Sequence, residues 1–150
     1  MIKVRSLILR IIAFFLAISF SCFLPIEAKA IDIPSVTNLA TLRNLAKESV
    51  PYEIAIDNNK PTLLEFYADW CTTCQGMATI VKDLHQQYGD HANLVMLDID
   101  DPKWQKQIEQ YRVTGVPQFT FLNSQQQVIK TLIGKVPKTI FVSFFEQFFS

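Results

Sequence analysis

Two cysteines near the middle of the chain are separated by two residues, in the segment Trp70-Cys71-Thr72-Thr73-Cys74. At this spacing the two sulfurs can close a small disulfide ring without much movement of the backbone. If a helix begins at Cys71, its sulfur lies among amide N–H groups that have no carbonyl partner within the helix, and these donors favour the thiolate. Cys71 is therefore the candidate nucleophile, and Cys74, one turn further on the core face, is the candidate resolving thiol. The alternative is a purely structural disulfide.

A zinc site is another use to consider, because the cysteines continue into the pattern Cys71-x2-Cys74-x10-His85-x5-His91. If Cys74 and His85 share one helix, a rise of about 1.5 Å per residue separates them by roughly 16 Å. Zinc ligands lie only about 2.0–2.3 Å from the metal. We therefore expect no metal site, and we expect His85 to be a partly buried side chain that faces the core. No bound cofactor is expected either, since a dithiol itself carries two electrons.

Glu65 is an acidic residue inside a nearly continuous apolar run, Thr62–Ala68. Such a run predicts a strand that is buried on both faces, and alternation places Glu65 on the same face as Leu63 and Tyr67. Burial should raise the pKa of the carboxyl group. Glu65 could then take the proton of Cys74, directly or through a water, when Cys74 attacks a mixed disulfide. The alternative is a glutamate at a solvated strand end.

The elements that must position these residues alternate between helices and strands. Hydrophobic periodicity and turn residues predict helices over 38–49, 52–56, from about Cys71 to Tyr88, and around 104–111. Strands are expected over 62–68 and 93–100, followed by an antiparallel hairpin of 119–122 and 128–133. A last helix places four phenylalanines on one stripe, which we expect to pack in the core: Phe141, Phe144, Phe145 and Phe148. This order predicts an α/β fold with a mixed sheet and helices on both faces.

The first thirty residues have the pattern of an export signal. Three basic residues precede an uncharged, mostly apolar run over residues 11–24, and Ala28-Lys29-Ala30 follows. About twenty apolar residues are needed to span a bilayer, so a cleaved signal peptide and a retained membrane anchor both stay open. In either case residues 31–150 should face the non-cytoplasmic compartment. Lipidation at Cys22 is disfavoured, because Ser19-Phe20-Ser21 before it is a poor lipidation motif.

Composition narrows the class of protein further. Apolar residues make up 49% and charged residues 19% of the 150, as in globular proteins. Fourteen basic residues balance fourteen acidic ones, and without residues 1–30 ten bases stand against thirteen acids, a net charge of −3. This balance argues against a protein that binds nucleic acid phosphates.

Trp-Cys-x-x-Cys after a buried strand, with Gly115-Val116-Pro117 before a hairpin, resembles the thioredoxin superfamily. The likeness is greater to the membrane-anchored thioredoxin-like proteins of thylakoids and cyanobacteria, the TxlA type, which act in cytochrome b6f biogenesis. It runs from about Pro51 to the C-terminus. The segments that carry it are Pro51-Tyr52, Lys60-Pro61-Thr62, 65–71, 93–100, Lys103-Trp104 and 115–117.

The resemblance implies a thioredoxin fold over residues 51–150, preceded by a lead-in and short helix over 31–50. It implies a cis bond before Pro117, whereas the base rate for X–Pro bonds alone would predict trans. It also implies that the backbone of Val116 pairs with a substrate peptide, that Trp70 and Pro117 contact the substrate, and that the family's buried acid falls on Glu65.

Three positions depart from ordinary thioredoxins. Thr72-Thr73 replaces Gly-Pro between the cysteines, so the reduction potential cannot be transferred from them. Thr79 stands where many thioredoxins have a proline. The lysine that ordinary thioredoxins place beside the buried acid would fall near Met96.

The sequence thus predicts a monomeric protein thiol–disulfide oxidoreductase that is exported across a membrane or anchored in it. The resemblance implies the thylakoid lumen side, with the periplasm as the other setting. The resemblance implies that it reduces client disulfides, including those of apocytochromes, and that a CcdA-like transmembrane thiol carrier supplies its electrons. Two alternatives remain: an oxidase or isomerase of the same fold, and a non-catalytic binding module in which the disulfide is only a staple.

Overall fold

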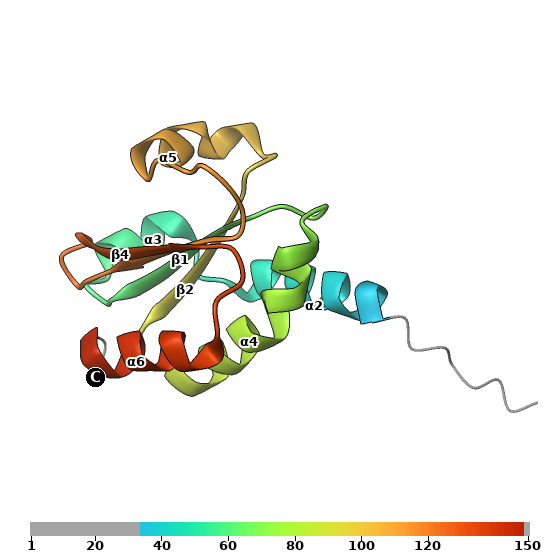
Figure 1. Ribbon diagram of the computed structural model, residues 1–150. Coiled ribbons are helices and arrows are strands. Elements are labelled where there is room, and N and C mark those ends of the chain that lie inside the picture. Colours follow the sequence, from blue (N-terminus) through green and yellow to red (C-terminus); the bar gives the residue numbers. More distant parts are fainter. Residues whose placement is uncertain (1–33, 149–150) are drawn as a thin grey trace, which may run out of the picture. The chain divides into compact units, whose positions relative to one another are not determined.

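The computed structural model describes residues 34–148. The predictions for residues 1–30, including the signal or anchor and Cys22, lie outside the described residues. Within 34–148 no helix has the length and apolar character needed to cross a bilayer. The elements are α2 (Pro34–Glu48), α3 (Tyr52–Asp57), β1 (Thr62–Tyr67), α4 (Thr72–Tyr88), β2 (Asn93–Asp98), the 3-10 helix η1 (Pro102–Trp104), α5 (Gln105–Gln110), β3 (Gln118–Leu122), β4 (Val128–Ile133) and α6 (Lys138–Phe148) (Figure 1).

The four strands form one mixed sheet in the order β2-β1-β3-β4. β1 is parallel to β2 and antiparallel to β3, and β3 is antiparallel to β4. All six residues of β1 are buried, because the strand is interior to the sheet and both of its faces are covered. The buried strand predicted around Glu65 is therefore confirmed.

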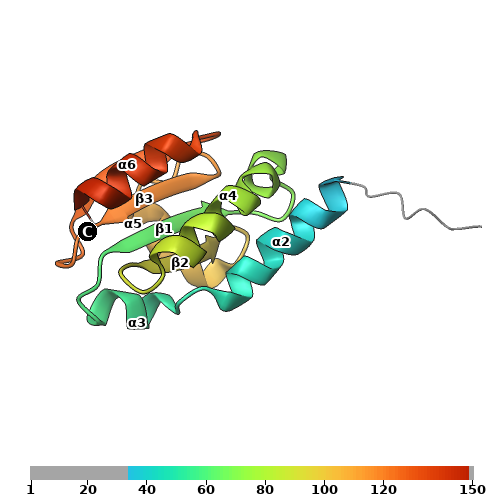
Figure 2. The ribbon, with the colours of Figure 1, turned by 90° about the horizontal axis from the view of Figure 1, so that it is seen from below.

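Helices cover both faces of the sheet, as predicted. Figures 1 and 2 show α2, α4 and α6 on one side, and α3 and α5 on the other. The first side encloses a large apolar cluster that contains Leu63, Tyr67 and both cysteines. The second side encloses a smaller cluster around Leu64 and Phe66.

The aromatic stripe of α6 packs mainly into the large cluster. Phe141 meets Phe119 of β3 edge-on at 4.9 Å between ring centroids, and Phe145 stacks on Tyr88 of α4 at 4.4 Å. Phe148, at the end of the helix, is 38% exposed. The expected core role is therefore confirmed for the two inner phenylalanines, and the stripe leaves the core only in its last turn.

Two element boundaries differ by more than one residue from those expected from the sequence. α2 begins at Pro34 rather than at residue 38. Proline is well tolerated at the first position of a helix, because the N–H of that residue would have no partner within the helix in any case. β2 ends at Asp98 rather than at 100, because the Asp98 carboxylate accepts a hydrogen bond from the Asp100 N–H at 3.0 Å. This local bond turns the chain out of the sheet.

Candidate functional site

Cys71 occupies the N-cap position of α4, immediately after the turn that leaves β1. Its backbone is extended, and its Sγ accepts a hydrogen bond from the Cys74 N–H at 3.0 Å. The sulfur thus takes the place of the side-chain oxygen that commonly caps a helix. Negative charge on this sulfur would be stabilised by that N–H and by the positive end of the helix dipole. The helix start predicted at the cysteines is confirmed.

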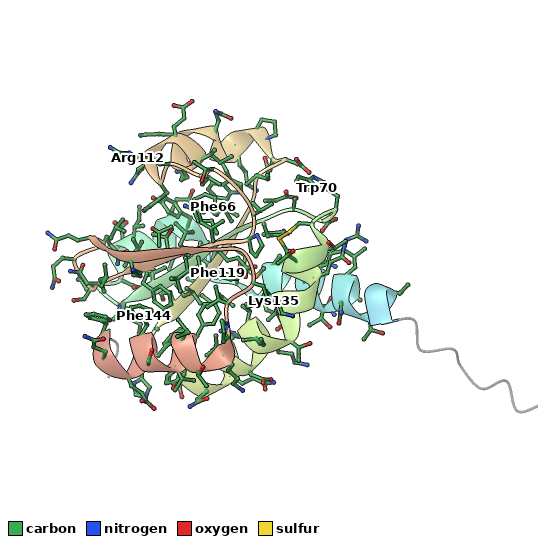
Figure 3. The ribbon with its side chains drawn as sticks, viewed as in Figure 1. Phe66, Trp70, Arg112, Phe119, Lys135 and Phe144 are labelled. Atoms are coloured by element: carbon green, nitrogen blue, oxygen red, sulfur yellow. A yellow bond between two sulfur atoms is a disulfide. The ribbon has the colours of Figure 1, made fainter. Side chains whose placement is uncertain are left out.

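The two cysteines are joined in a disulfide, with their Cα atoms 5.2 Å apart. Cys71 is 5% exposed and Cys74 is fully buried in the large cluster. Figure 3 shows the bond at the N-terminal end of α4, near the labelled Trp70. Cys71 is therefore the more accessible of the two sulfurs.

Trp70 forms an exposed apolar surface beside the disulfide, with 63% of its area accessible. Its Nε1–H donates to Asp100 Oδ2 at 2.7 Å, which joins the cysteine loop to the turn after β2. On the other side of the loop, Asp69 pairs with Arg43 of α2 at 2.8 Å. Sequence reasoning missed both carboxylates and the arginine, because their partners lie 26 to 30 positions away in the chain and no local pattern marks them.

The Val116–Pro117 bond is cis, as the resemblance implies and against the base rate for X–Pro bonds. Gln118 pairs with Phe66 in the antiparallel register of β1 and β3. Pro117 therefore lies at the end of the sheet where β1 stops and the cysteine loop begins. Pro117 is buried, and the half-buried Val116 packs against the cluster that contains both cysteines.

Glu65 is fully buried in the middle of β1, and neither of its carboxyl oxygens has a hydrogen-bond partner within residues 34–148. It lies between Leu63 and Tyr67, so alternation points it toward the same face as the cysteines. Burial raises the pKa of Glu65 from 4.5 to about 8. The expected elevation is confirmed, and the alternative of a solvated strand end is wrong.

Met96 lies directly across from Glu65 in the parallel register of β1 and β2. The resemblance implies that the lysine beside the buried acid of ordinary thioredoxins would fall near this residue. The thioether of Met96 carries no charge, so it cannot lower the pKa of the neighbouring carboxyl group as a lysine would.

His85 is half-buried on α4, as expected. Within residues 34–148, no group of three or more His, Cys, Asp or Glu side chains is arranged to hold a metal ion. The cysteines of the zinc-like pattern are instead bonded to each other.

Two proteins of known type are similar to this chain in sequence. The chain is 48% identical over 101 residues to the thiol:disulfide interchange protein TxlA of Synechococcus elongatus. This aligned segment covers 67% of this chain and 53% of that protein. It is 41% identical over 102 residues to the thioredoxin-like protein HCF164, chloroplastic, of Oryza sativa subsp. japonica, covering 68% of this chain and 39% of the relative. The chain thus spans about half or less of the length of these two proteins.

Structural comparison leads to the same fold. A point mutant of thioredoxin from Halobacterium salinarum superposes with a TM-score of 0.57 at 25% sequence identity, covering 64% of this chain and 80% of that one. The thioredoxin family model matches residues 42–147, a range that includes every residue of the site described above. On this evidence the chain belongs to the thioredoxin family.

Proposed function

We propose that this chain is a protein thiol–disulfide oxidoreductase that exchanges its Cys71–Cys74 pair with the disulfides of client proteins. The observation that carries the proposal is the pair itself: Cys71 caps α4 and keeps 5% of its area exposed, whereas Cys74, one turn behind it, is fully buried. A disulfide that served only as a staple would not need a sulfur placed on free amide N–H groups.

In the reducing direction the exchange takes two steps. The Cys71 thiolate attacks one sulfur of the client disulfide, forming a mixed disulfide and releasing the other client sulfur as a thiolate. Cys74 then loses its proton and attacks the Cys71 sulfur, forming the Cys71–Cys74 disulfide and releasing the second client thiolate. Two electrons pass from the dithiol to the client, and the two client thiolates take up protons.

Glu65 is the proposed proton acceptor for Cys74. With a pKa of about 8, it is mostly protonated at neutral pH in the disulfide form, and a minor fraction is ionised. It can therefore donate a proton when the disulfide is opened and take one back when Cys74 attacks. A permanently charged group in this buried position could not exchange protons in both directions.

The proposed client surface consists of Trp70, Val116 and Pro117. Trp70 offers an exposed aromatic face. The Val116 N–H and C=O take part in none of the backbone hydrogen bonds that lie outside the helices and strands of residues 34–148. An extended client segment could pair with them as an added strand does.

The cellular setting is part of the proposal. We propose that the domain acts on the non-cytoplasmic side of a membrane, in a thylakoid lumen or periplasm, and that it keeps the cysteines of apocytochromes reduced. Support comes from the export-like pattern of residues 1–30 and from relatives in a cyanobacterium and a chloroplast. Electrons would then have to cross the membrane, so a CcdA-like transmembrane thiol carrier is the proposed donor.

Trapping of the mixed disulfide tests the proposal. With insulin as the disulfide substrate, the reduced Cys74→Ser variant should accumulate a covalent adduct that dithiothreitol releases. The matched Cys71→Ser variant should form none, and the unaltered protein should turn over. Equal adducts with both variants, or none with either while the protein is folded, would overturn the assignment and leave the disulfide as a staple.

A further inference from the structure

Helix α2 is tied to the loop that carries the redox cysteines. Arg43 Nε of α2 donates a hydrogen bond to Asp69 Oδ2 at 2.9 Å, and Arg43 Nη2 forms an ion pair with the same oxygen at 2.8 Å. Asp69 lies two residues before Cys71, in the turn between β1 and α4. Its backbone carbonyl accepts a hydrogen bond from Gln75 Nε2 of α4 at 2.7 Å. The side chain of Asp69 is thus held by α2 and its backbone by α4.

Arg43 lies on a helix whose apolar face packs into the core. Leu42, which precedes Arg43, and Leu45 are buried in the same apolar cluster as Cys71 and Cys74. The ion pair itself is more open, with 55% of the Arg43 side chain and 40% of the Asp69 side chain exposed. Pairs this exposed contribute little to folding stability, so stability alone gives little reason for this contact.

The charges around the cysteine loop are mostly negative. Asp98, Asp100 and Asp101 lie at or after the end of β2, and Trp70 of the loop donates to Asp100. Lys103 is paired with Asp101, and the exposed Lys135 follows β4. An uncompensated Asp69 carboxylate would add a further negative charge two residues from Cys71, which disfavours a thiolate there.

We propose that Arg43 is a positioning residue for thiol–disulfide exchange: it fixes Asp69 in the turn and offsets its negative charge, so that the Cys71 thiolate forms readily. This inference rests on the proposed function. It assigns a direct influence on the redox site to α2, whose second half, including Arg43, lies within the range that the thioredoxin family model matches.

The expected effect is modest and measurable. Cα atoms two positions apart are at most about 7 Å apart, and we take about 7 Å as the scale of the distance from the Asp69 carboxylate to the Cys71 sulfur. A unit charge at about 7 Å in water shifts a thiol pKa by about 0.4 units. Release of Asp69 from Arg43 should therefore lower the thiolate fraction at neutral pH about two- to threefold.

The experiment measures the pH dependence of Cys71 alkylation by iodoacetamide in the reduced protein, with the modified residue identified by mass spectrometry. Arg43→Gln should raise the apparent pKa of Cys71 by about 0.4 units, whereas Asp69→Asn, which leaves the arginine unpaired, should lower it. The double variant should return close to the original value. The shifts should shrink at high salt, where surface charges are screened.

Lys47→Gln is the matched control, because Lys47 is an exposed base on the same helix. It should leave the Cys71 pKa unchanged. If the unaltered protein reacts at Cys71 but all four variants share its pKa, the inference is overturned while the proposed function stands. If the Cys71 pKa shift of Arg43→Gln persists in the double variant, Arg43 has only a structural role, and this result would also overturn the inference. If Cys71 does not react even in the unaltered protein, the proposed function itself fails.

Discussion

The buried carboxyl group of Glu65 should make the stability of the protein depend on pH. Below pH 4.5 both the folded and the unfolded chain hold its proton. Between pH 4.5 and about 8 only the folded chain holds it, so rising pH favours unfolding. Above that range the folded protein contains a buried charge, and the stability provided by the neutral group is lost.

The magnitude follows from the two pKa values. The difference between 4.5 and about 8 corresponds to about 5 kcal/mol of unfolding free energy across the whole range. Glu65→Gln keeps the shape of the side chain and removes the titration. Between pH 5.5 and 7.5 the unaltered protein should lose about 2–3 kcal/mol more stability than this variant.

Urea unfolding of the oxidised protein at several pH values measures this difference, with the disulfide kept intact throughout. Any constant cost of burying the glutamine amide cancels, because only the change with pH is compared. Glu48→Gln removes an exposed carboxylate from α2 and serves as the control; its curve should run parallel to that of the unaltered protein. If the Glu65→Gln curve also runs parallel, Glu65 does not titrate as a buried acid and its proposed proton role fails.

Further predictions concern the elements that hold the site. Leu42→Ala should lower the unfolding free energy by about 2–5 kcal/mol, because Leu42 is completely buried between α2 and the rest of the core; urea unfolding that shows no loss would mean that α2 does not pack there. Asn93→Leu should cost about 1–3 kcal/mol, since its Nδ2 donates to Thr62 Oγ1 and to Asn58 Oδ1, each at 3.0 Å. Amide hydrogen exchange should then quicken at the start of β1 and β2, and unchanged exchange would contradict this role.

Much of the fold was predictable because local patterns determine it. The continuous apolar run of β1 and the helical spacing of apolar residues in α4 both reflect burial that tertiary packing then provides. The hairpin of β3 and β4 follows the turn residues between its strands. Alternation placed Glu65 on the face of Leu63 and Tyr67, and burial of the strand predicted the direction of its pKa; the structure adds that the cysteines lie in the same cluster as Leu63 and Tyr67.

Other features could not be read from the sequence. The cis bond before Pro117 is a minority state for any X–Pro pair, and only the family resemblance implied it. The contacts of Trp70 with Asp100 and of Arg43 with Asp69 join distant parts of the chain. Exposed polar residues of this kind have no periodic signature, so their partners become evident only once the helices are placed around the sheet.

The reduction potential of the Cys71–Cys74 pair, measured by equilibration with a glutathione buffer, tests the central claim most directly. A disulfide reductase should give a potential well below about −200 mV, together with a Cys71 pKa clearly under about 8.5. A potential of about −120 mV would reverse the proposed direction of electron transfer and indicate an oxidase. A reduced protein in which Cys71 fails to react at all would contradict the oxidoreductase account and leave a binding module with a structural disulfide.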